Sequence, residues 1–343
     1  MRVPVVDATG RPLMPCHPAK ARLLIKRGKA LPKRNKLGIF YVQLTYEVEP
    51  ENQAVALGVD PGSKFEGFSV VGTRRTVLNV MSEAVTHVKR AVERRREMRR
   101  ARRYRKTRRR PERFNNRRKG KGFLPNSTRA RWEAKLRIIR QLLKILPISH
   151  VVVEDVKAET GKGKRLWNES FSPVQAGKEH FYRGLRELGF EPVLRRGWET
   201  KALRERFGLR KSRDKGEKSF WSHCVDAWVL AASVSGAERP DHTGLYYLAP
   251  LRFRRRQLHR LEPGRGGVRK PYGGTRSLGF KRGTLVRHPK WGLCYVGGHM
   301  GGRLSLHDLK TGKRLTQDAK LEECRVLTCV SWRSRYVFGR EVS

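Results

Sequence analysis

The sequence lacks the features of membrane-spanning and disulfide-stabilised proteins. No apolar run of about 18 residues and no signal peptide is recognised in the 343 residues. The five cysteines form no C-x-x-C pair, which predicts reduced cytosolic thiols and excludes a cysteine zinc site or a disulfide framework. No internal repeat stands out either. We therefore expect a cytoplasmic protein with no membrane partner.

Acidic residues are scarce relative to basic ones. The chain has 31 Asp and Glu against 78 Lys and Arg, and its formal net charge is +47. A free protein with this charge would repel itself strongly, so the composition predicts a bound polyanion, and nucleic acid fits better than a membrane surface. The length gives room for two or three domains with a real core.

The sequence also lacks a serine or cysteine nucleophile motif, a Walker loop and a G-x-G-x-x-G fingerprint. Three carboxylates stand out instead. Asp60 ends an apolar strand beside the turn residues Pro61 and Gly62, Glu154 follows the strand predicted over 148–153, and Asp226 lies in the most apolar helix. For Asp60 alone, an ordinary turn aspartate is the simpler interpretation.

Three converging carboxylates would repel one another and raise their pKa values, and divalent cations would remove that penalty. Mg²⁺ prefers carboxylate oxygens and accepts substrate phosphate. Two such ions about 3.5–4 Å apart would stabilise the attacking and leaving oxygens of a phosphodiester displacement. His223 precedes Asp226 by three residues, so we expect both on one helix face. It would serve as a metal ligand or as a base, and a satisfied core or interface histidine is the alternative.

The first 50 residues resemble a small α+β module. We expect strands over 3–6 and 38–46, a turn over 10–15, and a helix over 18–28 with one apolar and one basic face. The module is either a basic cap on the next domain or a nucleic-acid contact surface.

The next segments predict an α/β core. Strands over 55–60, 65–71 and 76–82 can pair in antiparallel order. Helices are then expected at 127–146, 172–188, 198–207 and 218–235, the first capped by Ser127-Thr128 and the second by Ser172-Pro173. Strands are expected at 148–153 and 190–194 between them, with a basic loop over 209–216.

An arginine-rich segment separates the first two carboxylates. Residues 90–110 lack Gly and Pro and predict a helix that is basic all round, and Pro111 ends it before a basic loop. Such a helix requires phosphates on several sides, and a disordered basic tail is the alternative. The expected nucleic-acid contacts in it are Arg94, Arg95, Arg99, Arg102, Arg103, Arg105 and Arg109.

The composition changes after Gly236. Residues 245–261 are basic with interspersed aromatics and include the expected nucleic-acid contacts Arg254, Arg255 and Arg256. A Gly/Arg linker follows over 264–279. Short strands and glycine turns over 283–338 predict a small all-β barrel or sandwich.

The motifs in this order carry a family resemblance. Gly58-Val59-Asp60-Pro61-Gly62, Val152-Val153-Glu154-Asp155 and His223-Cys224-Val225-Asp226-Ala227 resemble the three split motifs of a RuvC-type nuclease, which has an RNase H-like fold. The arginine-rich segment resembles a bridge helix. Pro12-Leu13-Met14-Pro15 resembles the PLMP motif of the transposon-encoded IscB family, relatives of CRISPR RNA-guided nucleases.

One departure places the chain near a branch of that family. IscB proteins carry an HNH nuclease between the second and third RuvC motifs, whereas here that interval contains a single histidine, His180. The chain is therefore similar to IsrB, the HNH-less branch. The resemblance implies a monomer bound to a guide omega RNA, which pairs with target double-stranded DNA beside a short adjacent motif. It also implies one RuvC site that nicks the displaced strand, with catalytic and metal-binding roles for Asp60, Glu154, Asp226 and His223. The expected cofactor is Mg²⁺ as two ions, with Mn²⁺ as a substitute, and the complex would be nucleoid-associated on its target.

We thus expect an α/β fold with an RNase H-like (RuvC) core split by a bridge helix, an N-terminal α+β module and a C-terminal all-β domain. The expected segments are a PLMP-like module (1–52), RuvC-I (53–84), the bridge helix and basic loop (85–124), RuvC-II with connecting elements (125–217), the RuvC-III helix (218–236), a basic RNA-contacting segment (237–280) and a β module reading target-adjacent duplex (281–343). Two other functions remain open: a guide-independent RuvC-like nuclease such as a junction resolvase, and a non-catalytic RNA-binding protein.

Overall fold

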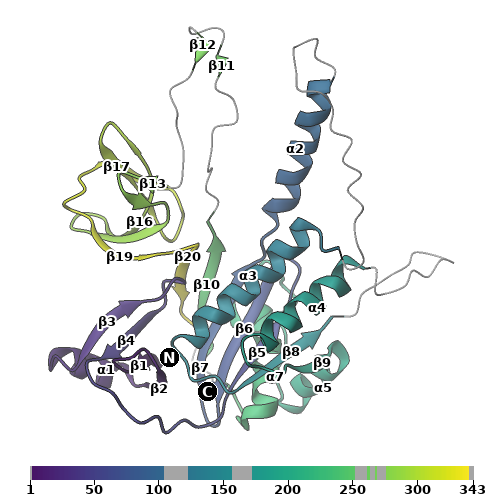
Figure 1. Cartoon of the computed structure of the whole chain (residues 1–343). Coiled ribbons are helices and arrows are strands. Elements are labelled where there is room, and N and C mark those ends of the chain that lie inside the picture. Colours follow the sequence, from purple (N-terminus) through teal and green to yellow (C-terminus); the bar gives the residue numbers. More distant parts are fainter. Residues whose placement is uncertain are drawn as a thin grey trace.

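A seven-stranded mixed sheet forms the centre of the molecule, with strand order β20-β10-β7-β6-β5-β8-β9 (Figure 1). The computed structural model describes residues 2–103, 123–156, 172–251, 261–262, 267–268 and 276–339. In this part of the chain a four-stranded N-terminal sheet and a five-stranded C-terminal sheet stand beside the central one. The expected mixed α/β class is therefore confirmed. No helix in the described ranges combines the length and apolarity needed to cross a membrane.

The N-terminal module is a sheet of order β2-β1-β4-β3 covered by one helix. Its elements are β1 (Val3–Val6), β2 (Pro12–Cys16), α1 (Pro18–Lys26), β3 (Ala30–Arg34) and β4 (Phe40–Leu44). The turn predicted over 10–15 is wrong, because most of it is the edge strand β2. The actual turn precedes it, where the Asp7 carboxylate accepts a hydrogen bond from the backbone of Arg11 at 2.8 Å. An edge strand tolerates the two prolines that suggested a turn.

The central sheet begins as the sequence predicted. Three consecutive antiparallel strands, β5 (Val55–Asp60), β6 (Phe65–Gly72) and β7 (Thr76–Glu83), are confirmed. β8 (His150–Asp155) then pairs in parallel with β5, and β9 (Val193–Arg196) pairs in parallel with β8. The parallel pairs put the ends of β5 and β8 at the same edge of the sheet.

Helices cover both faces of this sheet. Along β5, Leu57 and Val59 belong to one buried cluster with α3 (Asn126–Leu143) and α4 (Pro173–Arg186). Ala56 belongs to the opposite cluster, with α6 (Phe220–His223) and α7 (Val225–Ser235). α5 (Gly197–Arg206) packs on α7. Both faces are therefore buried, which explains the continuous apolar runs of these strands.

Two helix boundaries differ from the prediction. α3 begins after Pro125 without a side-chain cap, so Ser127 and Thr128 do not cap it, and it ends at Leu143 before the expected 146. The single helix predicted over 218–235 is broken at Cys224, where φ is −114°. The Cys224 carbonyl accepts a hydrogen bond from the Trp228 backbone at 2.8 Å, which starts α7, and a second one from the Ser69 hydroxyl of β6 at 3.3 Å.

The sheet also recruits strands from the end of the chain. β10 (Leu245–Pro250) pairs in parallel with β7, and β20 (Trp332–Val337) pairs antiparallel with β10. The expected boundaries at residues 236 and 281 therefore do not coincide with the edge of the central sheet. The C-terminal sheet has the order β18-β17-β16-β15-β19, which agrees with the predicted short strands. Its strands are β15 (Thr284–His288), β16 (Gly292–Met300), β17 (Arg303–Asp308), β18 (Arg314–Ala319) and β19 (Arg325–Cys329); the two-residue strands are β11 (Leu261–Glu262), β12 (Gly267–Val268), β13 (Arg276–Ser277) and β14 (Phe280–Lys281).

The arginine-rich helix projects from the body of the molecule (Figure 1). It is α2 (His87–Arg103), which confirms the helix predicted from residue 90 as far as residue 103. The rest of that prediction lies outside the described residues.

Candidate active site

Strand register brings Asp60 and Glu154 side by side. Val59 of β5 lies opposite Val153 of β8 in the parallel pair, and the two carboxylates follow immediately at the same sheet edge. Burial raises the pKa of Asp60 well above its usual value, and Glu154 and Asp226 raise it further by charge repulsion. The three acidic groups singled out in the sequence thus influence one another electrostatically in the fold.

Close contact between α7 and β5 brings in Asp226. A Cβ atom at Gly58 would lie 1.8 Å from the Ala227 carbonyl oxygen, so only glycine lets the helix backbone rest on the strand here. Asp226 lies in the first turn of α7, where the helix dipole favours a negative charge. Its side chain is 5% exposed and that of Asp60 is 13% exposed, so both carboxylates are largely shielded from water.

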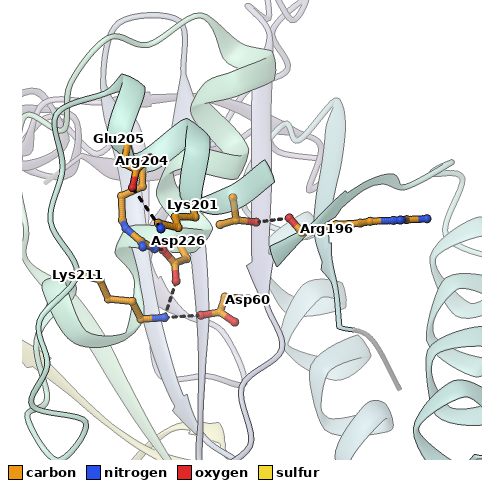
Figure 2. Close-up of polar contacts among 8 residues, drawn as sticks. Asp60, Arg196, Lys201, Arg204, Glu205, Lys211 and Asp226 are labelled. Carbon is orange, nitrogen blue, oxygen red and sulfur yellow. Dashed lines mark hydrogen bonds and ion pairs between the residues drawn. The ribbon is translucent and has the colours of Figure 1, made fainter. Parts of the chain in front are cut away.

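Two cations neutralise these acidic groups. Arg204 of α5 and Lys211 of the following loop both form ion pairs with Asp226, and the Lys211 ammonium lies 3.7 Å from Asp60 (Figure 2). Asp60 and Asp226 raise the pKa of Lys211, although burial opposes this. The sequence analysis missed both cations, since Arg204 is one of many helix arginines and Lys211 was recognised only as part of a basic loop.

The donor set at this sheet edge suits a hard divalent cation, because it consists of carboxylate oxygens that repel one another. In the described parts of the chain, no three His, Cys, Asp or Glu side chains are already arranged around a common metal position. The contacts of Arg204 and Lys211 with Asp226 explain this arrangement. The residues therefore fit a metal on the condition that Lys211 gives up its place between Asp60 and Asp226.

Asp155 and His223, which lie near the three carboxylates in the sequence, contact other groups. Asp155 alternates with Glu154 along β8 and forms an ion pair with Lys178 at 2.6 Å. The His223 ring packs against Phe65 with centroids 4.7 Å apart, and its Nε2 atom lies 3.2 Å from the carbonyl oxygen of Lys215. The structure thus does not place His223 on one helix face with Asp226, because the break at Cys224 separates them.

A buried ion pair lies behind the carboxylates. The Lys135 ammonium of α3 contacts Glu66 of β6 at 2.6 Å, and both side chains are at most 2% exposed. Burial lowers the pKa of Lys135, while Glu66 and, more weakly, Asp60 raise it. This pair supplies a fixed positive group within the electrostatic reach of Asp60.

The predicted nucleic-acid contacts are only partly described. Arg94, Arg95 and Arg99 of α2 have exposed side chains and form no ion pair within the described residues. The backbone of α2 also includes Arg102 and Arg103, whereas Arg105, Arg109, Arg254, Arg255 and Arg256 lie outside the described residues.

Comparison with known proteins adds one family match. Residues 3–169 match the model of a family described as RRXRR protein. The letters R-R-X-R-R of this description fit Arg99-Arg100-Ala101-Arg102-Arg103 on α2. No curated protein matches the chain.

Among solved structures, the chain is similar to "T. thermophilus RuvC in complex with Holliday junction substrate". The match has 14% sequence identity and a TM-score of 0.29, and it covers 52% of this chain and 90% of that one. At this TM-score the likeness carries no argument about fold or function.

Proposed function

We propose that the protein is a RuvC-type, metal-dependent DNA endonuclease that is directed by a guide RNA and nicks the displaced strand. The observation that carries this proposal is the meeting of Asp60, Glu154 and Asp226 at one sheet edge, from three distant parts of the chain. The order β7-β6-β5-β8-β9, three antiparallel strands followed by two parallel ones, supports an RNase H-like core. The particular relative proposed is the IsrB branch of the IscB family.

Asp60, Glu154 and Asp226 would hold Mg²⁺ or Mn²⁺, as two ions. The bound ions would supply charge stabilisation to the attacking and leaving oxygens of the phosphodiester. The chain itself positions these ligands, because the absence of a side chain at Gly58 lets α7 rest on β5. Lys211 would leave the carboxylates and contact the incoming phosphate. His223 would act as a base or ligand only after its ring leaves Phe65 and the Lys215 carbonyl.

The arginines of α2 would hold RNA and heteroduplex through phosphates, while base pairing reads the sequence. The helix carries adjacent exposed arginines without internal counter-ions in the described residues, which supports this role. The N-terminal module would contact the folded RNA, and the C-terminal sheet would read the target-adjacent duplex.

A single catalytic centre favours a nick over a double-strand break. Between Glu154 and Asp226 the one histidine before the third motif is His180, and its Nε2 atom lies 2.9 Å from Glu133. The Nε2 atom of this α4 histidine is thus engaged with a carboxylate of α3 and is unsuited to an HNH metal site.

The first test replaces one carboxylate. Asp60→Ala should lower nicking by ~10³-fold or more while guide-RNA binding is retained, because a metal ligand is lost and no basic contact changes. Asp155→Asn is the matched control on the same strand end and should keep nicking. Equal nicking by Asp60→Ala and wild type would refute the site.

The second arm distinguishes a guide-independent nuclease. The protein is purified from its native operon, co-purifying RNA is sequenced, and nicking is measured before and after complete RNase digestion. Guided nicking should disappear with the RNA. Nicking that survives digestion would support the structure-specific nuclease, and binding without any nicking would support the non-catalytic RNA-binding protein.

A further inference from the structure

Besides α2, the N-terminal and C-terminal sheets enclose a second basic site. β3 lies next to β19 (Figure 1). Side chains of the two sheets line a groove of about 380 Å³. We call it the inter-module groove. Its lining includes Lys33, Arg34, Phe40, Arg287, Arg325 and Val326.

The groove concentrates positive charge without compensation. Arg287 and Arg325 are directly opposite each other in the β15–β19 pair. Like charges at such positions destabilise a sheet. In the described residues none of the four lining cations forms an ion pair, whereas exposed arginines elsewhere, such as Arg186 with Glu191 at 2.8 Å, do so.

Arg34 is the most constrained of these cations. Its Nη1 atom donates a hydrogen bond to the Gly38 carbonyl at 2.8 Å, which fixes the guanidinium at the wall of the groove. Burial lowers the pKa of Arg34, and Arg287 lowers it further, while Tyr246 raises it. The fold therefore holds a partly desolvated arginine beside a like charge.

The two walls of the groove are fixed on a common base. Leu37 and Ile39, between β3 and β4, are fully buried in the core of the central sheet. A Cβ atom at Gly38 would lie 2.2 Å from Ser334 Oγ of β20, so the module sits tightly against the last strand of that sheet. A bound anion would relieve the repulsion between the cations on these walls.

We propose that the inter-module groove binds the phosphate backbone of a polynucleotide strand, with Arg34, Arg287 and Arg325 contacting its phosphates. Phe40 and Val326 supply apolar walls against which a sugar or base packs. Val326 is 55% exposed, so its side chain is accessible to a ligand. One strand would thereby contact both modules. The ligand class rests on the proposed function, since it is the polyanion that function requires.

The test is a binding measurement in EDTA that is independent of catalysis. All proteins carry Asp60→Asn. The groove variant is Arg287→Gln/Arg325→Gln. The control is Lys310→Gln/Lys320→Gln, two exposed lysines in and after the β17–β18 hairpin, at the opposite edge of the same sheet. Both pairs lower the net charge by the same two units, so a difference between them reports position instead of total charge.

The ligands are a fluorescein-labelled single-stranded RNA of mixed sequence and a double-stranded DNA of equal length. The groove variant should bind at least one of them about tenfold more weakly than the control does, with a salt slope lower by about two. The ligand that shows the loss identifies the bound strand. Equal binding and equal slopes for the two variants with both ligands would overturn the proposal.

Thermal unfolding separates binding from a structural role. Without ligand the groove variant should melt at the same temperature as the control or higher, because a like-charge pair is removed. Inorganic phosphate should raise the melting temperature of the control more than that of the groove variant. A lower melting temperature without ligand would assign the arginines to folding and contradict the proposal. A positive result without any nicking by the wild type would sink the proposed function alone.

Discussion

The carboxylate cluster (Asp60, Glu154 and Asp226) and the inter-module groove differ in how their charges are compensated. At the cluster, Asp60 and Asp226 meet two cations that the chain itself provides, Arg204 and Lys211. In the groove, four cations meet no acidic side chain in the described residues. At the carboxylates, an incoming cation must displace the cations that the protein itself supplies. In the groove, an anionic ligand would supply the missing counter-charge.

A third arrangement is the pair Lys135–Glu66, in which both charges are buried and satisfied. Its role is structural, and removing one of its two charges should have a larger effect than any change in the other two regions.

Lys135→Met should have the largest effect. It leaves Glu66 charged and unpaired among apolar side chains, which costs about 3–5 kcal/mol of folding stability. Urea unfolding monitored by tryptophan fluorescence measures this loss. The double variant Lys135→Met/Glu66→Gln should recover much of it, because the isolated charge is removed as well. Equal stability of wild type and Lys135→Met would show that the pair is not buried in solution.

Neutralising exposed cations of α2 tests a region in which the described residues supply no counter-charge. Arg94→Gln/Arg95→Gln/Arg99→Gln should weaken nucleic-acid binding by roughly 10- to 100-fold at moderate salt and lower the salt slope by about three. The fold should remain intact, since Arg95 and Arg99 repel each other at i,i+4 spacing. Fluorescence anisotropy over a salt series measures both quantities.

The matched control neutralises three exposed cations that already have internal partners. Arg183→Gln/Arg186→Gln/Lys201→Gln removes the same charge from residues that lie near Glu187, Glu191 and Glu205. We expect a much smaller loss of binding from this variant. If both variants lost affinity equally, total charge would govern binding and α2 would have no special role.

The sequence predicted the local parts of this structure well. The strands that carry Asp60 and Glu154 follow from apolar runs that end in turn residues or carboxylates, and Ser172 caps α4 as its hydroxyl does in the structure. These features depend on neighbouring residues only. They were enough to select three carboxylates that the fold then brings together.

The parts that the sequence did not predict depend on distant contacts. β20 joins the central sheet by pairing with β10, although about eighty residues separate the two strands. Lys211 reaches the carboxylates because Ser212 is held by a backbone hydrogen bond to Trp221 at 3.0 Å. The Ser69 hydroxyl of β6 contacts the Cys224 carbonyl at the junction of α6 and α7. No local pattern encodes these three contacts.

The smallest expected effect is a change in how folding stability depends on pH through Asp60. Asp60 has a raised pKa in the metal-free fold, above its usual value of 3.8, so the folded state binds more protons than the unfolded state between those two values. Stability from this group is therefore complete below the usual pKa and is lost as pH rises through the raised one. Asp60→Asn should flatten this loss, and Lys211→Met should steepen it, because the cation that opposes the rise is removed. Melting temperatures in EDTA between about pH 4 and pH 8 measure the three slopes.

Added Mn²⁺ should raise the melting temperature of Lys211→Met more than that of wild type, because the ion then replaces a missing charge without first displacing a lysine. Equal slopes in the three proteins would mean that Lys211 does not balance the carboxylates in solution.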